Sequence, residues 1–177
     1  DLIVKNANMF VGIKEKGNNN GWQDVYFEEL NKTFTELMQS IGWQSYHAWC
    51  SYFAELVWTL SYKNTKPNIM ARLEELFSPL AYQTWTNFKD SEFTTSEIPI
   101  QGSVVIWRLI KGGKETNSGH AGIVVVVTGK TFKTVEGNTN IKGSRDGDQV
   151  ANKVRRLDFS KKEGLNLLGF IYPLKIA

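Results

Sequence analysis

Apolar residues in about the first 100 positions of the chain recur at spacings of three and four, which is typical of helices that bury one face. The pattern predicts a short helix within residues 1–13, an amphipathic helix from Val25 to Ile41 that closes near Gly42, a helix that carries Cys50, Phe53, Val57 and Trp58, and a short helix from Asn68 to Leu76. The segment 14–21 is rich in Gly and Asn and predicts a loop. A second, polar loop is predicted to run to about Ile100.

The pattern changes in the second half of the chain, where short apolar runs rich in β-branched and aromatic residues predict strands. The predicted strands are Val104–Trp107, Ala121–Val127, Phe132–Val135, Val154–Leu157 and Leu167–Tyr172. Gly129 and Lys130 stand between two of them and indicate a hairpin. Consecutive short strands with tight connections pair antiparallel, so the fold class is predicted to be α+β, with N-terminal helices packed on an antiparallel sheet.

Size and charge narrow the class of protein further. The chain has 177 residues, of which 41% are hydrophobic, and residues 1–177 are expected to form a single domain. Its net charge is +3, with basic residues clustered only at Lys153, Arg155 and Arg156. This is too weak for a nucleic-acid-binding surface but compatible with attraction to an anionic polymer such as a cell wall. No apolar run is long enough to span a membrane.

The chemistry that the chain offers centres on a single cysteine. Cys50 stands at the front of a predicted helix, His120 at a predicted strand, and Glu136 and Asn138 two residues apart on another. A thiol nucleophile needs a base to take its proton, and the base needs a carboxylate or amide to hold its ring in the right tautomer. These four residues predict a cysteine hydrolase with Cys50 as nucleophile, His120 as base and Glu136 or Asn138 as the group that orients it.

Each of these residues also has a structural interpretation. A buried cysteine on a helix is most often a small apolar residue, and Glu136 beside Gly137 is compatible with a turn. His47, three residues before Cys50, is an alternative base, disfavoured because no third group lies near it in sequence. One Cys and two His give no zinc-ligand spacing, so neither a metal nor another cofactor is expected. A lone cysteine also excludes an internal disulfide.

Strand geometry imposes a condition on this interpretation. Side chains alternate between the two faces of a strand, and opposed residues in an antiparallel hairpin have a constant sum of sequence numbers. A regular hairpin with the two-residue loop Gly129-Lys130 would place His120 opposite Thr139 and turn Glu136 to the wrong face. The triad therefore requires an odd-length loop or a β-bulge that restores the parity.

Beyond these residues, the chain contains an ordered set of motifs. Gly12 to Gly21 resembles a "G-x-x-E…G-x-N-x-G" segment, Trp49-Cys50 with Phe53 a "W-C-x-x-F" helix, and Gly119 to Val124 a "G-H-x-G-I-V" strand; Pro99–Ile106, Val135–Asn140, Arg145–Val150 with Lys153–Arg156, and Gly169–Ile171 complete the set. Together they resemble the CHAP branch of the papain-like, NlpC-type superfamily of cysteine amidases and endopeptidases. The chain departs from the family pattern at Ser103, Gln149 and Tyr52, none of which belongs to the predicted triad.

The resemblance implies a papain-like fold and hydrolysis of amide bonds in peptidoglycan, either as an N-acetylmuramoyl-L-alanine amidase or as an endopeptidase. It also implies an oxyanion hole formed by the Cys50 N–H and a side chain from Gln44 or Tyr46. A cysteine acyltransferase and a catalytically silent wall-binding domain remain alternatives on the same fold.

The expected context follows from that substrate. The expected partner is peptidoglycan, with an immunity or inhibitor protein if the domain belongs to a toxin, and a monomer is expected. The expected location is secreted, periplasmic, wall-directed, or phage-encoded with release at lysis. The chain begins with Asp1 rather than Met, which is compatible with removal or omission of an upstream segment such as a signal peptide.

Overall fold

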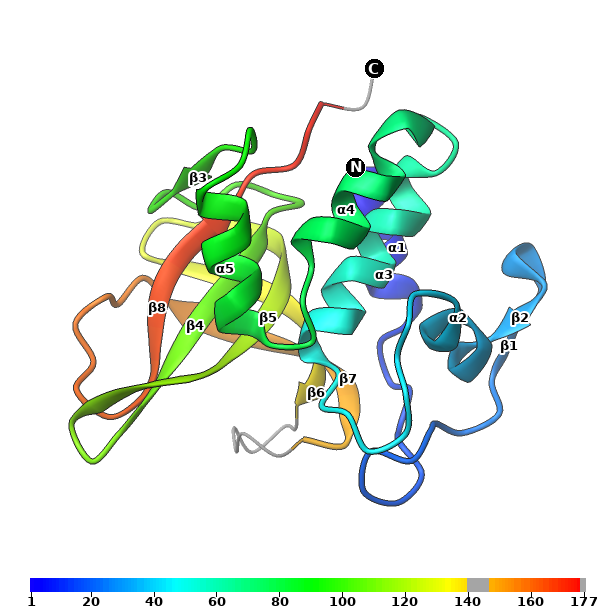
Figure 1. Ribbon diagram of the computed structural model, residues 1–177, viewed down its shortest axis with the longest axis horizontal. Coiled ribbons are helices and arrows are strands. Elements are labelled where there is room, and N and C mark those ends of the chain that lie inside the picture. Colours follow the sequence, from blue (N-terminus) through cyan, green and yellow to red (C-terminus); the bar gives the residue numbers. More distant parts are fainter. Residues whose placement is uncertain (140–146, 176–177) are drawn as a thin grey trace.

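Five α-helices and one large sheet make up most of the computed structural model, which describes residues 1–139 and 147–175 (Figure 1). The helices are α1 (Leu2–Met9), α2 (Phe34–Ser40), α3 (Cys50–Tyr62), α4 (Met70–Leu76) and α5 (Ala81–Lys89), with 3-10 turns at η1 (Glu28–Leu30) and η2 (Pro67–Ile69). A two-stranded ribbon, β1 (Tyr26–Phe27) and β2 (Lys32–Thr33), precedes α2. No helix among the described residues is long and apolar enough to cross a membrane.

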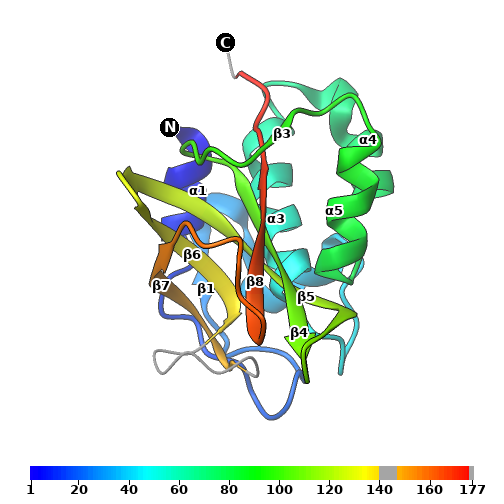
Figure 2. The same ribbon diagram turned by 90° about the vertical axis from the view of Figure 1, so that its left-hand side faces the viewer.

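The large sheet is antiparallel and has six strands in the order β3-β8-β4-β5-β6-β7 (Figure 2). Its strands are β3 (Thr95–Ser96), β4 (Val104–Lys111), β5 (Lys114–Thr128), β6 (Thr131–Thr139), β7 (Gln149–Arg156) and β8 (Gly164–Ile171). The helices lie on one face, where most of the buried apolar side chains gather. A smaller cluster, which includes Val105, Phe132 and Phe170, packs on the opposite face. The predicted α+β class is confirmed.

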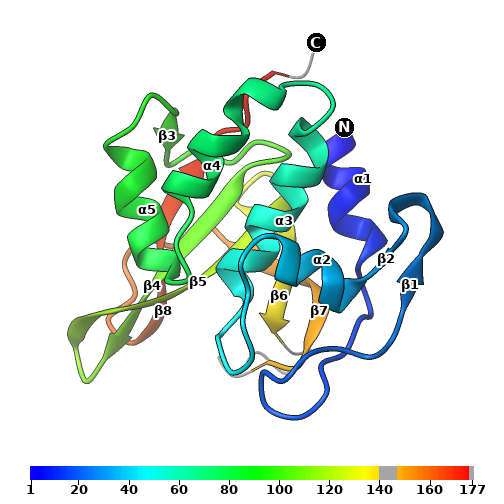
Figure 3. The same ribbon diagram turned by 45° about the vertical axis from the view of Figure 1, so that its right-hand side comes forward.

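Helix α3 is the centre of the helical layer (Figure 3). All but two of its 13 residues are buried, and Phe53 and Trp58 have no exposed surface. It contacts α1, α2, α4 and α5 as well as strands β5 and β6. Because α3 begins at Cys50 and lies against β5 and β6, the fold brings the thiol to the strands that carry His120, Glu136 and Asn138.

The helix predicted from Val25 to Ile41 is wrong in its first half. The helix begins only at Phe34, where Thr33 and Glu36 form a capping box: Thr33 Oγ1 accepts from the Glu36 N–H at 3.2 Å, and Glu36 Oε2 accepts from the Thr33 N–H at 2.7 Å. Just before it, Asn31 has a left-handed backbone with φ of 51°, which ends the preceding turn. Phe27 thus stands three residues before Leu30 and seven before Phe34, as in a helix, but belongs to the strand β1.

The long loop predicted to reach Ile100 is also wrong, because it contains α5 and β3. Helix α5 contacts β4 and β5, and Ala81, Thr84 and Phe88 form its buried face. Two of those three residues are small, so the apolar periodicity of this helix is weak. Gly112 and Gly113 form the β4–β5 turn, with positive φ angles of 60° and 71°.

The hairpin of β5 and β6 meets the parity condition through a bulge. Its loop has two residues, since Thr128 pairs with Thr131, but the register shifts between Val124 and Val126. Beyond the bulge Ile123 pairs with Val135, and continuing this register sets His120 opposite Asn138. The prediction that a bulge or odd loop restores the parity is confirmed.

Candidate active site

Cys50 is the first residue of α3 and is 6% exposed. Trp49 occupies the N-cap position without a side-chain capping bond, so the thiol lies where the helix presents free backbone N–H groups. The backbone N–H groups of Ser51 and Ala121 lie near the sulfur and lower the pKa of the thiol. These donors favour a negatively charged sulfur atom.

His120 lies on β5 beside the thiol and is 4% exposed. Its Nε2 is 2.7 Å from Oε2 of Glu136, which has no exposed surface. The ring and the Cys50 thiol line the same cavity, and each shifts the pKa of the other. The structure thus brings Cys50, His120 and Glu136 together in the order expected from the sequence.

Glu136 is held by more than His120. Arg155 of β7 donates from Nε to Oε1 at 2.8 Å and from Nη2 to Oε2 at 2.6 Å, and the Thr134 hydroxyl donates to Oε1 at 2.6 Å. The guanidinium group lies 4.8 Å from the ring centroid of Trp107, in the geometry of a cation–π contact. Because Arg155 donates two parallel hydrogen bonds, it fixes the plane of the Glu136 carboxylate and stabilises its negative charge.

The pKa values of the three groups are coupled. Burial raises the pKa of the Cys50 thiol, but hydrogen bonding and charge at His120, with the two backbone N–H groups, outweigh it and lower the pKa. Burial opposes the charged form of His120, yet the adjacent Glu136 carboxylate raises its pKa to about 9. Burial likewise opposes charge on Glu136, but His120 and Arg155 hold the pKa of that carboxyl well below its usual range. This favours a thiolate–imidazolium pair at neutral pH.

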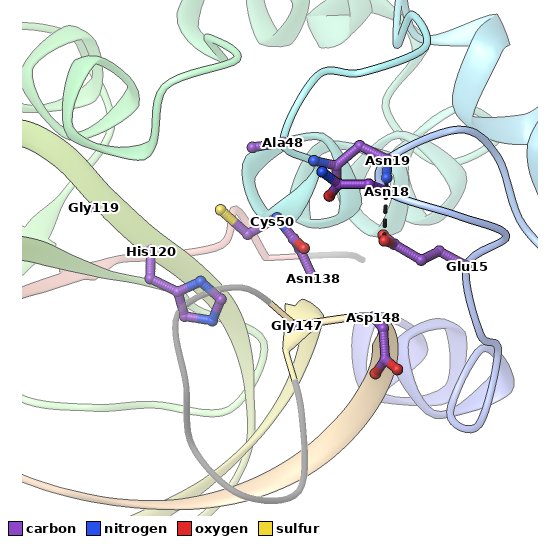
Figure 4. A pocket seen from close by; sticks show the side chains of 10 residues that line it. All are labelled: Glu15, Asn18, Asn19, Ala48, Cys50, Gly119, His120, Asn138, Gly147 and Asp148. Carbon is purple, nitrogen blue, oxygen red and sulfur yellow. Dashed lines mark hydrogen bonds between the residues drawn. The ribbon is translucent and has the colours of Figure 1, made fainter.

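A cavity of about 170 Å³ opens over Cys50 and His120 (Figure 4). Its other lining residues are Glu15, Asn18, Asn19, Ala48, Gly119, Asn138, Gly147 and Asp148. In Figure 4, Cys50 and His120 lie on one side and Glu15, Asn18 and Asn19 on the other. The cavity therefore presents carboxylates and amides opposite the thiol.

Glu15 connects the N-terminal loop to the start of α3. Its Oε2 accepts from Trp49 Nε1 at 2.8 Å, and its Oε1 accepts from the Asn19 backbone N–H at 3.1 Å. Since Trp49 immediately precedes Cys50, one carboxylate holds both the loop that forms one wall of the cavity and the helix end that carries the thiol.

Two positions in the motifs of β5 and β6 must be glycine because no side chain would fit there. A Cβ at Gly122 would lie 2.7 Å from Cγ of Glu136, and a Cβ at Gly137 would lie 2.8 Å from ring atoms of Phe53 and Trp49. These glycines let β5 accommodate the carboxylate and let β6 approach α3 closely. Asn138, with φ of 51°, adopts the left-handed backbone that Asn tolerates, and its side chain reaches the cavity wall.

The structure does not bring Gln44, Tyr46 or His47 to the cavity. All three are exposed in the loop before α3, and Tyr46 is 74% exposed with φ of 71°. The Tyr46 N–H donates to the Asn19 carbonyl oxygen, and Nδ1 of His47 lies 3.4 Å from the Tyr52 hydroxyl. The side-chain amides that do line the cavity are those of Asn18, Asn19 and Asn138.

Sequence reasoning gave no role at the site to Thr134, Arg155 or Glu15, nor to Asn18 and Asn19. Thr134 shares a strand face with Glu136, a relation that the two-residue period could have revealed. Arg155 required the β6–β7 register, which no local pattern gives. Asn140, Arg145 and Asp146 of the sequence motifs lie outside the described residues. Among the described residues, no group of three or more His, Cys, Asp or Glu side chains could hold a metal ion.

The architecture is α+β, with a helix-start cysteine set against a histidine of an antiparallel sheet, which is the papain-like arrangement. The CHAP domain family matches residues 41–138, and the chain belongs to that family. CHAP domains are typically cysteine or amidase hydrolases and suggest peptidoglycan hydrolysis in general. The match includes Cys50, His120, Glu136 and Asn138, whereas Glu15 and Arg155 lie outside it.

A solved structure supports the fold. The crystal structure of Ly7917 superposes with a TM-score of 0.51 at 16% sequence identity, covering 97% of this chain and 61% of that chain. At this identity the likeness concerns the fold alone. No curated protein matches the sequence.

Proposed function

We propose that this domain hydrolyses an amide bond in the peptide part of peptidoglycan, with Cys50 as nucleophile, His120 as acid and base, and Glu136 as the residue that orients His120. The contact that carries the proposal is the 2.7 Å bond from His120 Nε2 to the buried Glu136 carboxylate. Because this bond occupies Nε2, it leaves Nδ1 for the thiol at the cavity.

The reaction follows from these positions. The Cys50 thiolate attacks the amide carbonyl carbon, and the C–N bond breaks as His120 gives its Nδ1 proton to the leaving amine. Water then attacks the resulting thioester while His120 takes its proton, which releases the acid product and the thiolate. Glu136 retains its charge throughout and stabilises the imidazolium form.

The oxyanion of the tetrahedral intermediates needs donors near the sulfur. The Cys50 N–H at the start of α3 is the first of these. The amides of Asn18 and Asn19 line the cavity and replace Gln44 and Tyr46 as the available side-chain donors. Asn138 supplies a further polar contact beside His120 rather than a substitute for Glu136.

The lining of the cavity favours hydrolysis of a polar substrate over the acyltransferase alternative. A lipid-directed relative would need a long apolar channel, whereas this cavity measures about 170 Å³ and contains two carboxylates and three amides. A silent wall-binding domain would have no need for a buried, fully paired Cys-His-Glu arrangement. The choice between amidase and endopeptidase depends on which bond lies over Cys50. In either case the domain would act where it meets the wall, as a secreted or periplasmic enzyme or after release at lysis.

The test is wall hydrolysis by purified variants, followed by mass analysis of the released fragments. Cys50→Ala should fold and lose activity, because it removes the nucleophile but little apolar volume, and His120→Ala should behave in the same way. His47→Ala is the matched control, since His47 is exposed and outside the cavity, and it should retain most activity. A folded Cys50→Ala variant that still clears cell-wall suspensions would refute the proposal, and new amino termini among the products identify the bond.

A further inference from the structure

A second cavity, of about 510 Å³, lies among helices α2, α3 and α4. It is lined by Gln39, Ser40, Ile41 and Gly42 at the end of α2, Glu55 and Thr59 on α3, and Met70, Ala71 and Glu74 on α4. It shares no lining residue with the cavity at Cys50. Its volume is in the range of roughly 300–1,000 Å³ that is usual for pockets that bind small molecules.

Glu55 is the unusual residue of this second cavity. It is 7% exposed, in a helix of which all but two residues are buried, and no residue that the structure describes donates a hydrogen bond to its carboxyl group or forms an ion pair with it. A glutamate in such a place must stay protonated or bear the free-energy cost of a desolvated, unpaired charge, and residues kept at such a cost are often functional. A ligand with a positive charge in this cavity would supply the missing partner of the Glu55 carboxyl group.

The other residues that line the cavity indicate the charge and the shape of such a ligand. Glu74, on the exposed side of α4, adds a second carboxylate, and none of the lining residues is basic. Ile41 and Met70 supply apolar surface in the same cavity, and the Thr59 hydroxyl lies one helical turn after Glu55. Two carboxylates with adjacent aliphatic side chains fit a cation on an apolar stem.

We propose that this cavity binds an alkylammonium group, such as the side chain of a lysine residue in a peptide. The ammonium group lies between Glu55 and Glu74, and its methylene stem lies along Met70 and Ile41. The site is independent of the hydrolytic centre and requires no activity at Cys50.

Proton linkage supports this assignment. Burial, together with the charge of Glu74, raises the pKa of Glu55 to about 8, so the empty cavity holds a largely neutral acid at pH 7. The ionisable groups near it are Glu74 on α4 and Tyr52 on α3, while α2 contributes the uncharged Gln39 and Ser40. An ammonium ion favours the carboxylate form, so its binding releases a proton and strengthens as the pH rises from 6 to 8.

The test is a titration with Nα-acetyl-lysine methylamide followed by amide NMR, with the neutral norleucine analogue as reference. The lysine compound should shift the amides of Gly42, Thr59 and Ala71 and bind more tightly at pH 8 than at pH 6. Glu55→Gln and Glu74→Gln should each weaken binding by at least about tenfold. Glu97→Gln is the control for charge, because Glu97 is exposed and outside the cavity.

The outcomes separate this site from the catalytic one. Cys50→Ala should bind the lysine compound with unchanged affinity, whatever its effect on wall hydrolysis. Equal binding of the norleucine analogue, or no effect of either glutamate substitution, would overturn the proposal. Glu74 is exposed, so Glu74→Gln still provides the test if Glu55→Gln fails to fold.

Discussion

At the scale of single residues, Glu136 determines the charge state of the site. Among the described residues it is the carboxylate that contacts His120, and it also accepts three hydrogen bonds from Arg155 and Thr134. A buried anion with this many donors stays ionised, and an ionised neighbour keeps His120 protonated. His120 in turn stabilises the thiolate of Cys50.

The first prediction concerns the pH dependence of Cys50. Because its pKa is lowered, alkylation by iodoacetamide should remain fast at pH 6, well below the ordinary thiol range near 8.5. The His120 pKa is about 9, so the imidazolium is present below that pH and lost as the pH rises through it. Alkylation should thus change little from pH 6 to 9, while hydrolysis, which needs the proton of His120, declines on the alkaline side near pH 9.

His120→Ala provides the control for this pH profile. Without the imidazolium, alkylation should slow sharply at pH 6 and follow an ordinary thiol titration. An ordinary titration in the unmodified protein would instead indicate that Cys50 is a core residue without an activated sulfur.

A second prediction concerns Arg155 as a positioning residue. Arg155→Met removes the fork that fixes the Glu136 carboxylate, so kcat should fall by roughly 10- to 100-fold with little change in KM. Arg155→Lys should recover only part of the loss, because an ammonium group cannot form the bidentate pair. The neighbouring Arg156, which is exposed, gives the control variant Arg156→Met. Normal kcat in a folded Arg155→Met variant would argue that His120 and Thr134 hold the carboxylate without Arg155.

At the scale of helices and strands, the sequence predicts those elements that show a clear apolar pattern within their own residues. The helix at Cys50 and the strands around His120 and Glu136 have strong apolar periodicity, and the structure contains them. Helix α5 was missed because its buried face includes Ala81 and Thr84. Helix α2 was predicted too long because Phe27 and Leu30 continue, by coincidence, the three- and four-residue spacing of the helix that begins at Phe34. The alternation of side chains showed that a bulge or an odd-length loop was needed, but the sequence could not place the bulge at Val125. Its position depends on how β5 pairs with β6.

A third prediction concerns the capping box of α2. Thr33→Ala removes the acceptor for the Glu36 N–H, so the free energy of unfolding should fall by ~1 kcal/mol in urea denaturation with an unchanged m-value. Thr94→Ala is the control, since Thr94 is exposed and contributes only its backbone carbonyl to a hydrogen bond. It should change the free energy by less than ~0.5 kcal/mol. Equal effects of the two substitutions would show that the cap does not stabilise the helix.

At the scale of the whole molecule, the site depends on segments far apart in sequence. Backbone hydrogen bonds join the N-terminal segment to β7: the Gly12 N–H donates to the Val150 carbonyl oxygen and the Val150 N–H donates to the Ile13 carbonyl oxygen, both at 2.9 Å. Nearby, the Glu15 N–H donates to the Asp148 carbonyl oxygen at 2.7 Å. Strand β8, near the end of the chain, lies between the short edge strand β3 and β4. The part that matches the CHAP family, residues 41–138, therefore contains Cys50, His120 and Glu136 but lacks two strands of their sheet.

The last prediction follows from this arrangement and tests whether residues 1–177 form one cooperative domain. A fragment of residues 41–138 lacks α1, which packs on α3, and β8, whose absence leaves the buried edge of β4 unpaired. It also lacks Glu15 and Arg155, so the start of α3 and the Glu136 carboxylate lose their partners. The fragment should give no cooperative thermal transition by circular dichroism, whereas the full chain should unfold in a single step. A cooperatively folded fragment that alkylates at Cys50 as fast as the full chain would instead assign the fold and the activated thiol to the matched segment alone.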